Sequence, residues 1–340
     1  MLPGRRALLA LIAASPLAAT VGLTARQSPK SDVSRRADGP PATADRRPPT
    51  ADTYLFAYFT GNGEHGLRFA RSDDGLRWRR VADGRVYLAP TVGGRLMRDP
   101  SIVAGSDGQY HMVWTTGWWD RGFGVSHSRD LKTWSAPSFV PVLPDEPGVR
   151  NVWAPEIHHD ARAGQYVIVW ASTIAGRFPE TAHVGDAGQD GQRLNHRLYA
   201  TTTSDFLRYT PARLFYDGGF SAIDGVVVRD GDDVVLVVKD ETRYPEPRKD
   251  LRIARGTAIA GPFGPADAAF SPSWVEGPTV LRLGDHWRVY YDEYTRKRYG
   301  AMDTRDFRTF TPVADVTFPE GMRHGTAFTV PSAIADALER

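Results

Sequence analysis

The chain has 340 residues, of which 41% are hydrophobic and 11% aromatic, so it can bury the core of one large domain or of two ordinary ones. Its 42 Lys and Arg residues nearly balance its 40 Asp and Glu residues, which does not favour nucleic acid or an anionic membrane as a partner. The absence of cysteine excludes disulfides, thiolate nucleophiles and metal sites with Cys ligands.

The N-terminal segment predicts export. Arg5 and Arg6 precede an apolar stretch that ends among small residues, so residues 1–26 have the order of a signal peptide. The paired arginines suit twin-arginine export as well as the general secretory route. An uncleaved anchor is a further alternative, for which the apolar run is short. Residues 27–51 are rich in Pro, Ser, Asp and Arg and predict a disordered linker. We therefore expect a periplasmic or extracellular protein whose catalytic domain spans residues 52–340.

From residue 52 onward, short alternating apolar runs between turn-forming residues predict an all-β fold. The clearest runs are YLFAYF (54–59), YHMVWT (110–115), YVIVWA (166–171), DVVLVVK (233–239) and WRVYYD (287–292). A second signature places a hydroxyl residue before Asp and an aromatic residue, in SDDGLRW (72–78), SRDLKTW (128–134), TSDFLRY (203–209) and TRDFRTF (304–310). Together they define a unit of roughly fifty residues, which suits one four-stranded propeller blade.

Five segments open these units: DPSIVAG (99–105), APEIHHD (154–160), IDGVVVR (223–229), EGPTVLR (276–282) and HGTAFTV (324–330). The N-terminal unit has no opening segment, and nothing follows the C-terminal one, so each supplies what the other lacks. We therefore expect a five-bladed β-propeller closed by pairing of the C-terminal strand with the N-terminal blade. The third unit departs from the pattern, because TAIAGPFGP replaces its Asp-aromatic turn. A β-sandwich is the alternative, but it does not call for such a period.

The opening segments bring acids together. The first strand of every propeller blade lines the central channel, so we expect the five residues Asp99, Glu156, Asp224, Glu276 and His324 to meet at one end of it. Converging carboxylates perform acid–base chemistry on a glycosidic bond or bind a hard cation such as calcium. A calcium site would more plausibly use neighbouring residues of one loop, and a third acid beside a proton donor would raise the pKa of that donor.

Tryptophans accompany these segments. Trp114 and Trp170 lie inside predicted strands and are expected in the core, where large aromatic side chains dominate burial. Trp118, Trp119 and Trp153 lie at the ends of inner strands. There we expect them to contact a ligand, because their flat rings can stack on the apolar face of a sugar.

The chain resembles glycoside hydrolase family 43 and related five-bladed β-propeller furanosidases and xylosidases. The resemblance rests on RDPSI, VWAPEI, AIDG, VEGPT and RHGT, in that order, between about Tyr54 and Val330. It implies an inverting hydrolase of terminal pentose or furanose units, of the α-L-arabinofuranosidase or β-D-xylosidase type, acting on an oligo- or polysaccharide. It further implies that Asp99 is the general base, that Asp224 tunes the acid, and that Glu276 is the general acid.

The resemblance also implies a calcium ion or an ordered water in the channel near His324, although a structural role for this histidine is an alternative. No cofactor is expected to be required. Arg98 and Arg323 are further predicted substrate contacts, and Arg98 is expected to keep Asp99 ionised. Glu156 stands where many family members have Asp, so it contacts the substrate or holds the WAP segment in place.

Two polar segments are expected near the site. The insertion at 178–200 carries His196 and Arg197, which reach the sugar or stay in an exposed loop. Asp240, Glu241 and Arg243 are expected to form an ion-pair network that supports Asp224 and Arg98.

Other functions remain open at this point. The substrate can be another furanoside, such as galactofuranose or D-arabinose of envelope glycans, or the propeller can be a non-catalytic carbohydrate-binding module. The retention of all three acids favours an enzyme, because a lectin has no need for a proton donor. We expect a monomer that binds neither nucleic acid nor, after signal cleavage, a membrane.

Overall fold

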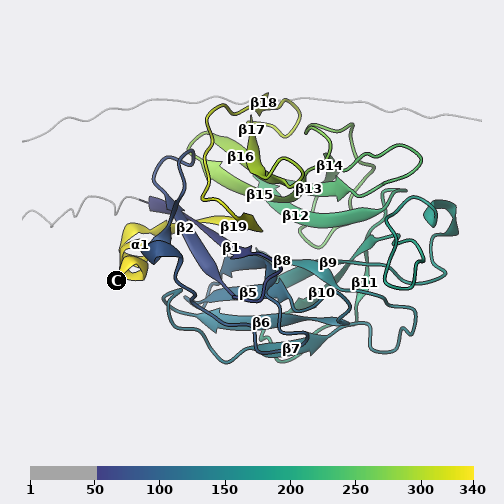
Figure 1. Cartoon of the computed structure of the whole chain (residues 1–340), viewed down its shortest axis with the longest axis horizontal. Helices are drawn as coiled ribbons and strands as arrows, with labels where there is room; N and C mark the ends of the chain where they lie inside the picture. Colours follow the sequence, from purple (N-terminus) through teal and green to yellow (C-terminus); the bar gives the residue numbers. More distant parts are fainter. Residues whose placement is uncertain (1–51) are drawn as a thin grey trace, which may run out of the picture. The chain divides into compact units, whose positions relative to one another are not determined.

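The computed structural model describes residues 52–340, which form five antiparallel sheets arranged as the blades of a β-propeller (Figure 1). The predicted all-β, five-bladed architecture is therefore confirmed. The predicted export signal (1–26) and linker (27–51) lie outside the described residues. Within 52–340, no helix is both long and apolar enough to span a membrane.

Each blade is numbered by its innermost strand, in chain order. Blade one contains β4 (Arg98–Ala104), β5 (Tyr110–Thr115), β6 (Gly122–Ser128) and β7 (Ser138–Pro141). Blade two contains β8 (Trp153–Asp160), β9 (Gln165–Ser172), β10 (Arg197–Thr203) and β11 (Arg213–Tyr216). Blade three contains β12 (Ala222–Asp230), β13 (Asp233–Asp240) and β14 (Asp250–Gly256), and blade four contains β15 (Glu276–Leu283), β16 (His286–Glu293), β17 (Arg298–Thr304) and β18 (Thr311–Pro312).

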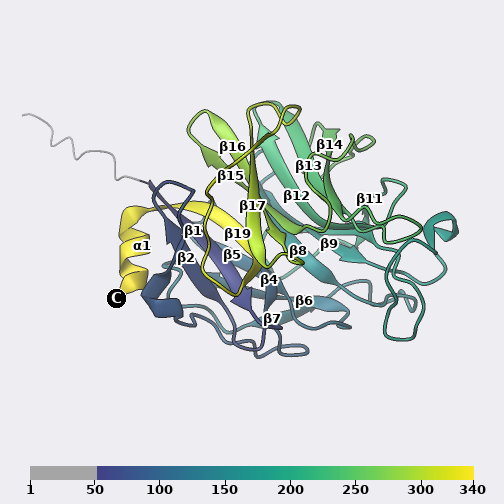
Figure 2. The same ribbon diagram turned by 45° about the horizontal axis from the view of Figure 1, so that its top comes forward.

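Blade five joins the two ends of the described chain. Its strands, from the channel outward, are β19 (Met322–Pro331), β1 (Asp52–Thr60), β2 (Arg68–Ser72) and β3 (Arg79–Arg80). Asp52 pairs with Pro331 and Thr60 with Met322, so the predicted closure by the C-terminal strand is confirmed (Figure 2). Short 3-10 helices occur at Val81–Gly84 and Pro179–Thr181, and the chain ends in α1 (Ser332–Glu339), a helix that the sequence patterns did not predict.

The innermost strands form a closed ring. Contacts run from β4 to β8, β8 to β12, β12 to β15, β15 to β19, and back from β19 to β4. The five opening segments therefore line one channel, as the sequence predicted.

The innermost strand of every blade has an irregularity at the same place. In all five, two residues interrupt the pairing with the second strand, for example between Arg98 and Ser101 in β4. The first interrupting residue is Asp99, Ala154, Asp224, Gly277 or His324, and the first four have φ of 53°, 46°, 54° and 56°. Such bulges re-aim side chains and are frequent beside active sites.

This register corrects one sequence inference. The five polar residues of the opening segments are not equivalent, because only Asp99, Asp224 and His324 occupy the same register position. Glu276 lies one residue earlier in its strand, and Glu156 lies two residues later. The sequence does not reveal the position of the bulge. Aligning the five opening segments by their motifs therefore placed all five polar residues at the same height in the channel.

The Asp-aromatic signature forms the same turn in four blades. In blade one, Ser128 Oγ accepts a hydrogen bond from the backbone N of Leu131 at 2.8 Å, and Asp130 Oδ1 accepts from Lys132 N and Thr133 N at 2.9 and 2.7 Å. The pairs Ser72 with Asp74, Thr203 with Asp205 and Thr304 with Asp306 repeat this pattern. These side chains satisfy backbone donors that a tight turn would leave unpaired. Blade three lacks the signature and has three strands.

The hydrophobic core consists of layers between neighbouring sheets. One layer joins blades one and two through residues such as Phe123 and Ile168, and another joins blades two and three through Leu198 and Leu236. Trp114 and Trp170 are fully buried in such layers, which confirms their predicted core role. Because each layer needs both of its sheets, the closed ring fixes the channel that holds the polar residues.

Three histidines that are wholly or partly buried predict acid sensitivity. Burial lowers the pKa of His127, His158 and His196 to about 4, whereas the unfolded chain binds these protons near the ordinary histidine value of about 6.5. Their stabilisation is therefore complete above pH 6.5 and is lost as the pH falls through 4. Burial raises the pKa of Glu156 to about 8, so the folded protein holds a proton there that the unfolded chain releases. This gain in stability on acidification offsets the loss caused by about one of the three histidines. We expect the melting temperature to fall by about 5 °C or more between pH 6.5 and 5. A flat or rising profile in calorimetry would contradict this assignment.

Candidate active site

A cavity of about 520 Å³ lies at the end of the channel where the innermost strands begin. All five blades contribute to it. Of the predicted site residues, it is lined by Arg98, Asp99, Trp118, Trp119, Trp153, His196, Asp224, Glu276, Arg323 and His324. The structure thus brings these predicted residues together, whereas Glu156 and Arg197 do not line the cavity.

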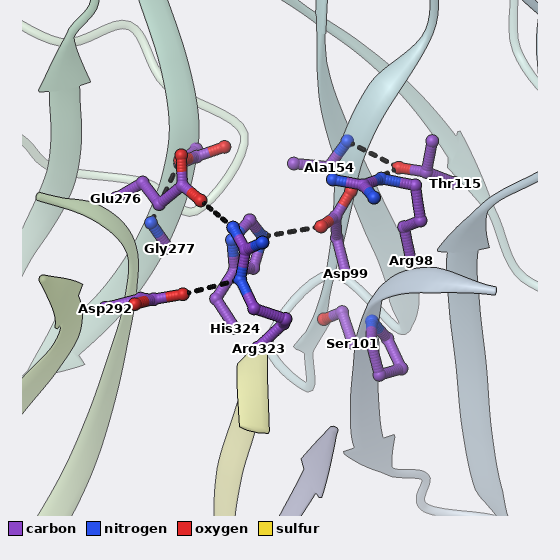
Figure 3. A network of polar contacts seen from close by, with 12 residues as sticks. Arg98, Asp99, Ser101, Thr115, Ala154, Glu276, Gly277, Asp292, Arg323 and His324 are labelled. Carbon is purple, nitrogen blue, oxygen red and sulfur yellow. Dashed lines mark hydrogen bonds and ion pairs between the residues drawn. The ribbon is translucent and has the colours of Figure 1, made fainter. Parts of the chain in front are cut away.

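Asp99 is buried at the base of this cavity. Thr115 Oγ1 accepts from Ala154 N at 2.8 Å, so its own proton is directed to Asp99 Oδ2, also at 2.8 Å (Figure 3). The other oxygen, Oδ1, forms an ion pair with His324 Nε2 at 3.0 Å. Burial raises the pKa of Asp99, but His324, and to a smaller extent Arg98 and Thr115, outweigh it and hold that pKa well below its usual range. Asp99 is therefore a carboxylate at neutral pH, as a base requires.

His324 is the cationic partner of Asp99. Burial lowers the pKa of its imidazole, but the negative charges of Asp99, Asp224 and Glu276 outweigh burial and raise it to about 9. Its ring lies against Gly277, where an added Cβ would come within 2.0 Å of His324 Cγ. Gly277 also has φ of 56°, so both its conformation and the space for the histidine require glycine.

The calcium ion implied by the family resemblance does not fit these residues. Calcium takes oxygen ligands in sets of six to eight, and an imidazole nitrogen is not one of them. Across residues 52–340, no group of three or more His, Asp or Glu side chains is arranged to hold a metal ion.

Asp224 lies in blade three at the same register position as Asp99. Its Oδ2 accepts a hydrogen bond from Gly277 N at 3.0 Å, which fixes the carboxyl group beside the first residues of β15. Burial is the largest influence on its pKa and raises it, and the neighbouring Glu276 acts in the same direction. The residue is thus placed to act on Glu276 through its charge.

Glu276 stands between two cations. Arg323 Nη2 donates to its Oε1 at 2.6 Å (Figure 3). Lys239 Nζ lies 3.5 Å from its Oε2. Burial raises the pKa of Glu276, but Lys239, His324 and Arg323 outweigh burial and lower it below the usual glutamate range. In this resting arrangement, Glu276 is therefore ionised at neutral pH.

Lys239 was not predicted from the sequence. It is buried at the end of β13 and contacts Glu241 Oε2 at 2.6 Å, while Glu241 also binds Lys249. Lys249 in turn binds Asp186 in the insertion at 178–200. A chain of alternating charges thus connects Glu276 to the insertion. The expected network of Asp240, Glu241 and Arg243 around Asp224 and Arg98 is wrong in its partners: Asp240 pairs with Arg252, and Arg243 with Asp186.

The predicted aromatic contacts form one wall of the cavity. Trp118 and Trp119 are 41% and 38% exposed, and Trp153 donates from Nε1 to the backbone oxygen of Trp118 at 2.6 Å. The guanidinium of Arg98 lies 4.2 Å from the Trp118 ring centroid. Asn62 Oδ1 accepts hydrogen bonds from Trp118 Nε1 at 3.0 Å and from Arg98 Nη1 at 3.2 Å. Exposed rings held in fixed positions are what a sugar-stacking wall needs.

Two predicted contacts differ from the others. Glu156 does not line the cavity; it is buried deeper in the channel, where Ser101 Oγ donates to its Oε2 at 2.6 Å. The contacts of this residue are therefore structural. His196 lines the cavity but is buried, with Nδ1 3.1 Å from Thr173 Oγ1, so the alternative of an exposed loop is wrong. Arg197, its neighbour, is buried and binds Asp217 and Thr181.

Sequence reasoning missed several residues that line the cavity or act on it: Asn62, Thr115, Asp186, Lys239, Asp292 and Tyr294. A signal existed for Thr115, Lys239 and Asp292, because each stands at or next to the end of the second strand of its blade, opposite an opening segment. The others lie in loops, whose direction the sequence does not specify.

Comparison with known families decides the classification. A family model of the glycosyl hydrolase 43-related group, described as "Probable glycosyl hydrolase domain", matches residues 50–336. The chain belongs to this family. This glycosyl hydrolase 43-related protein is therefore a glycoside hydrolase, in agreement with the resemblance seen in its motifs. No curated protein matches its sequence.

Solved structures are similar to this glycosyl hydrolase 43-related protein at low sequence identity. An α-L-arabinofuranosidase from Lactobacillus brevis is 18% identical, with 64% of this chain and 72% of that chain covered and a TM-score of 0.51. A thermostable family-43 glycoside hydrolase is 15% identical, with coverage of 67% and 78% and a TM-score of 0.49. A xylan β-1,4-xylosidase from Bacillus halodurans C-125 is 18% identical, with coverage of 66% and 42% and a TM-score of 0.47. The first likeness supports the propeller fold.

The position of Lys239 gives a testable pH effect. In a Lys239→Met variant, Glu276 loses the cation that most strongly lowers its pKa, so this pKa rises. We expect the alkaline limb of the pH profile of kcat/KM to move to higher pH. Lys239→Arg, which keeps the charge, is the control and should leave the limb in place. An unchanged limb in a folded Lys239→Met variant would show that Lys239 does not act on the titrating group.

Proposed function

We propose that this protein is an exported, inverting glycoside hydrolase that removes terminal pentose or furanose units from oligo- or polysaccharides, in the manner of an α-L-arabinofuranosidase or β-D-xylosidase. One observation carries the proposal. A carboxylate held ionised by a buried histidine, Asp99, and a second carboxyl group, Glu276, enter the same cavity from different blades. Inverting glycosidases use two such groups about 6.5–9.5 Å apart, with room for a water beside the base.

In the proposed reaction, Asp99 takes a proton from a water as that water attacks the anomeric carbon. Glu276 donates a proton to the departing glycosidic oxygen, and the C–O bond breaks. His324 keeps Asp99 ionised until it accepts the proton. Asp224 favours the protonated form of Glu276, since two neighbouring carboxylates resist being ionised together.

Glu276 must gain a proton before it can act as the acid. In the resting arrangement, Arg323 and Lys239 oppose this. A sugar hydroxyl that takes a hydrogen bond from Arg323 would weaken its hold on Glu276 Oε1 and raise the pKa of that carboxyl group. Substrate binding and acid protonation are then linked through Arg323.

A carbohydrate-binding propeller without activity is the alternative that the sequence left open, and the family match does not favour it. Another furanoside, such as galactofuranose or D-arabinose of envelope glycans, is an alternative substrate for the enzyme. Export rests on residues 1–26, as a proposal from the sequence.

A panel of 4-nitrophenyl glycosides separates these functions. We expect turnover of the α-L-arabinofuranoside or the β-D-xyloside; turnover of only the β-D-galactofuranoside would favour the envelope-glycan alternative. Binding of a sugar by calorimetry with no turnover of any glycoside would favour the binding module.

A further inference from the structure

A second, larger cavity adjoins the active-site cavity. This groove, of about 1160 Å³, runs along β17 between the β16–β17 turn and the segment 312–321 that leads from blade four to blade five. The segment is anchored to both blades, because Val313 N donates to Ala301 O and Thr317 N donates to Leu76 O. Gly61, Tyr294 and Arg323 line both cavities, so the groove begins where the active-site cavity ends.

Arg323 marks the junction between the two cavities. Its Nη2 donates to Glu276 Oε1 at 2.6 Å, and its Nε donates to Asp292 Oδ2 at 2.9 Å (Figure 3). Asp292 lines the groove. The groove therefore lies on the Glu276 side of the cavity, whereas Asp99 enters from blade one. A proton donor faces the oxygen of the departing group, so the remainder of the substrate leaves the cavity on this side.

Aromatic residues line another part of the active-site cavity. Trp118, Trp119 and Trp153 stand there with Asp186 and Leu194 of the insertion. Trp119 also lines a further cavity of about 470 Å³, so the groove is the larger of the two spaces that share lining residues with the active-site cavity. Its volume exceeds the roughly 300–1,000 Å³ of pockets that enclose a drug-sized ligand, so more than one sugar unit can fit.

The lining of the groove suits a carbohydrate. Tyr294 provides aromatic surface at the junction with the active-site cavity, and Arg298 and Glu320 provide hydrogen-bonding groups. Aromatic surface with a few placed polar groups is the usual composition of a specific ligand site. We infer that the groove between blades four and five binds the leaving-group part of the substrate, and that this part is a chain of several sugar units. This inference rests on the proposed function, because it takes Glu276 as the proton donor.

The test compares two substrates of the full-length protein that carry the same terminal sugar, a 4-nitrophenyl glycoside and an oligosaccharide of three or four units. Ala314→Trp and Glu320→Trp each place a large side chain on an exposed groove residue. Ala161→Trp, in an exposed turn outside both cavities, is the matched control. Binding energy from remote sugar units appears in kcat/KM, so we expect each groove variant to lower kcat/KM about 10-fold for the oligosaccharide only.

Three outcomes are informative. The inference is supported if the two groove variants lose kcat/KM for the oligosaccharide alone and Ala161→Trp keeps the wild-type value. Equal losses on both substrates in both groove variants, or no loss on either, overturn it while the proposed function stands. Failure of the wild-type protein to cleave either substrate overturns the proposed function itself, and the inference falls with it.

Discussion

Replacing Asp99 with Asn is expected to lower kcat about 10²- to 10⁴-fold, the contribution that a positioned base makes to proton transfer. An amide has the shape of the carboxylate and can keep the hydrogen bond from Thr115, but it cannot take a proton from water. The loss should therefore appear in kcat, with the melting temperature as the check that the variant is folded. The substitution also removes the negative charge that raises the pKa of His324 to about 9, so that pKa should fall.

Asp107→Asn is a matched control for this variant. Asp107 also lies beside a histidine, with Oδ1 3.2 Å from His111 Nε2, but it stands in the turn at the other end of β4. We expect Asp107→Asn to change kcat by less than about twofold, as for most substitutions outside a functional site. A folded Asp99→Asn variant with kcat within about tenfold of wild type would refute the base assignment.

Replacing Glu276 with Gln is expected to have an effect that depends on the leaving group. A sugar leaving group needs a proton as the bond breaks, so its kcat should fall about 10²- to 10⁴-fold. A 2,4-dinitrophenyl group is a stable anion and needs little protonation, so its hydrolysis should be much less affected. The measurement is kcat/KM of wild type and variant over a series of aryl glycosides of increasing phenol pKa.

The expected signature is a steeper dependence on the phenol pKa in the variant than in wild type. Glu146→Gln, which removes a partner of Arg177 away from both cavities, should leave the dependence unchanged. If Glu276→Gln lowered kcat/KM by the same factor for all substrates, Glu276 would bind or position the sugar, and another group would serve as the acid.

The fold was predictable because its repeats contain two recognisable patterns: apolar residues that alternate along a strand, and Ser/Thr-Asp pairs whose side chains form the hydrogen bonds of a turn. YHMVWT (110–115) coincides with β5 to the residue, and the Ser/Thr-Asp signature marks four outer turns whose backbone donors it satisfies. The missing opening segment at one end and the spare one at the other predicted the ring closure. The helix α1 carries no such signal, since its eight residues are too few for a clear period.

The sequence predicted the acidic residues of the site, but it did not predict the charged groups that set their pKa values. The shared bulge aims Asp99 and Asp224 at the cavity but leaves Glu156 two residues deeper, and the motifs contain no trace of this step. Lys239 enters from the neighbouring strand of blade three, so its contact with Glu276 spans two blades and requires the ring geometry. His196 and Arg197 are adjacent, yet only His196 lines the cavity.

The anomeric form of the first product tests the central claim most directly. Proton NMR of the wild-type protein acting on its best nitrophenyl glycoside can record the sugar before mutarotation. A single displacement between Asp99 and Glu276 predicts that the sugar first appears with the anomeric configuration opposite to that of the substrate. A first product with the configuration of the substrate would require a covalent intermediate, and it would contradict the roles assigned to both residues.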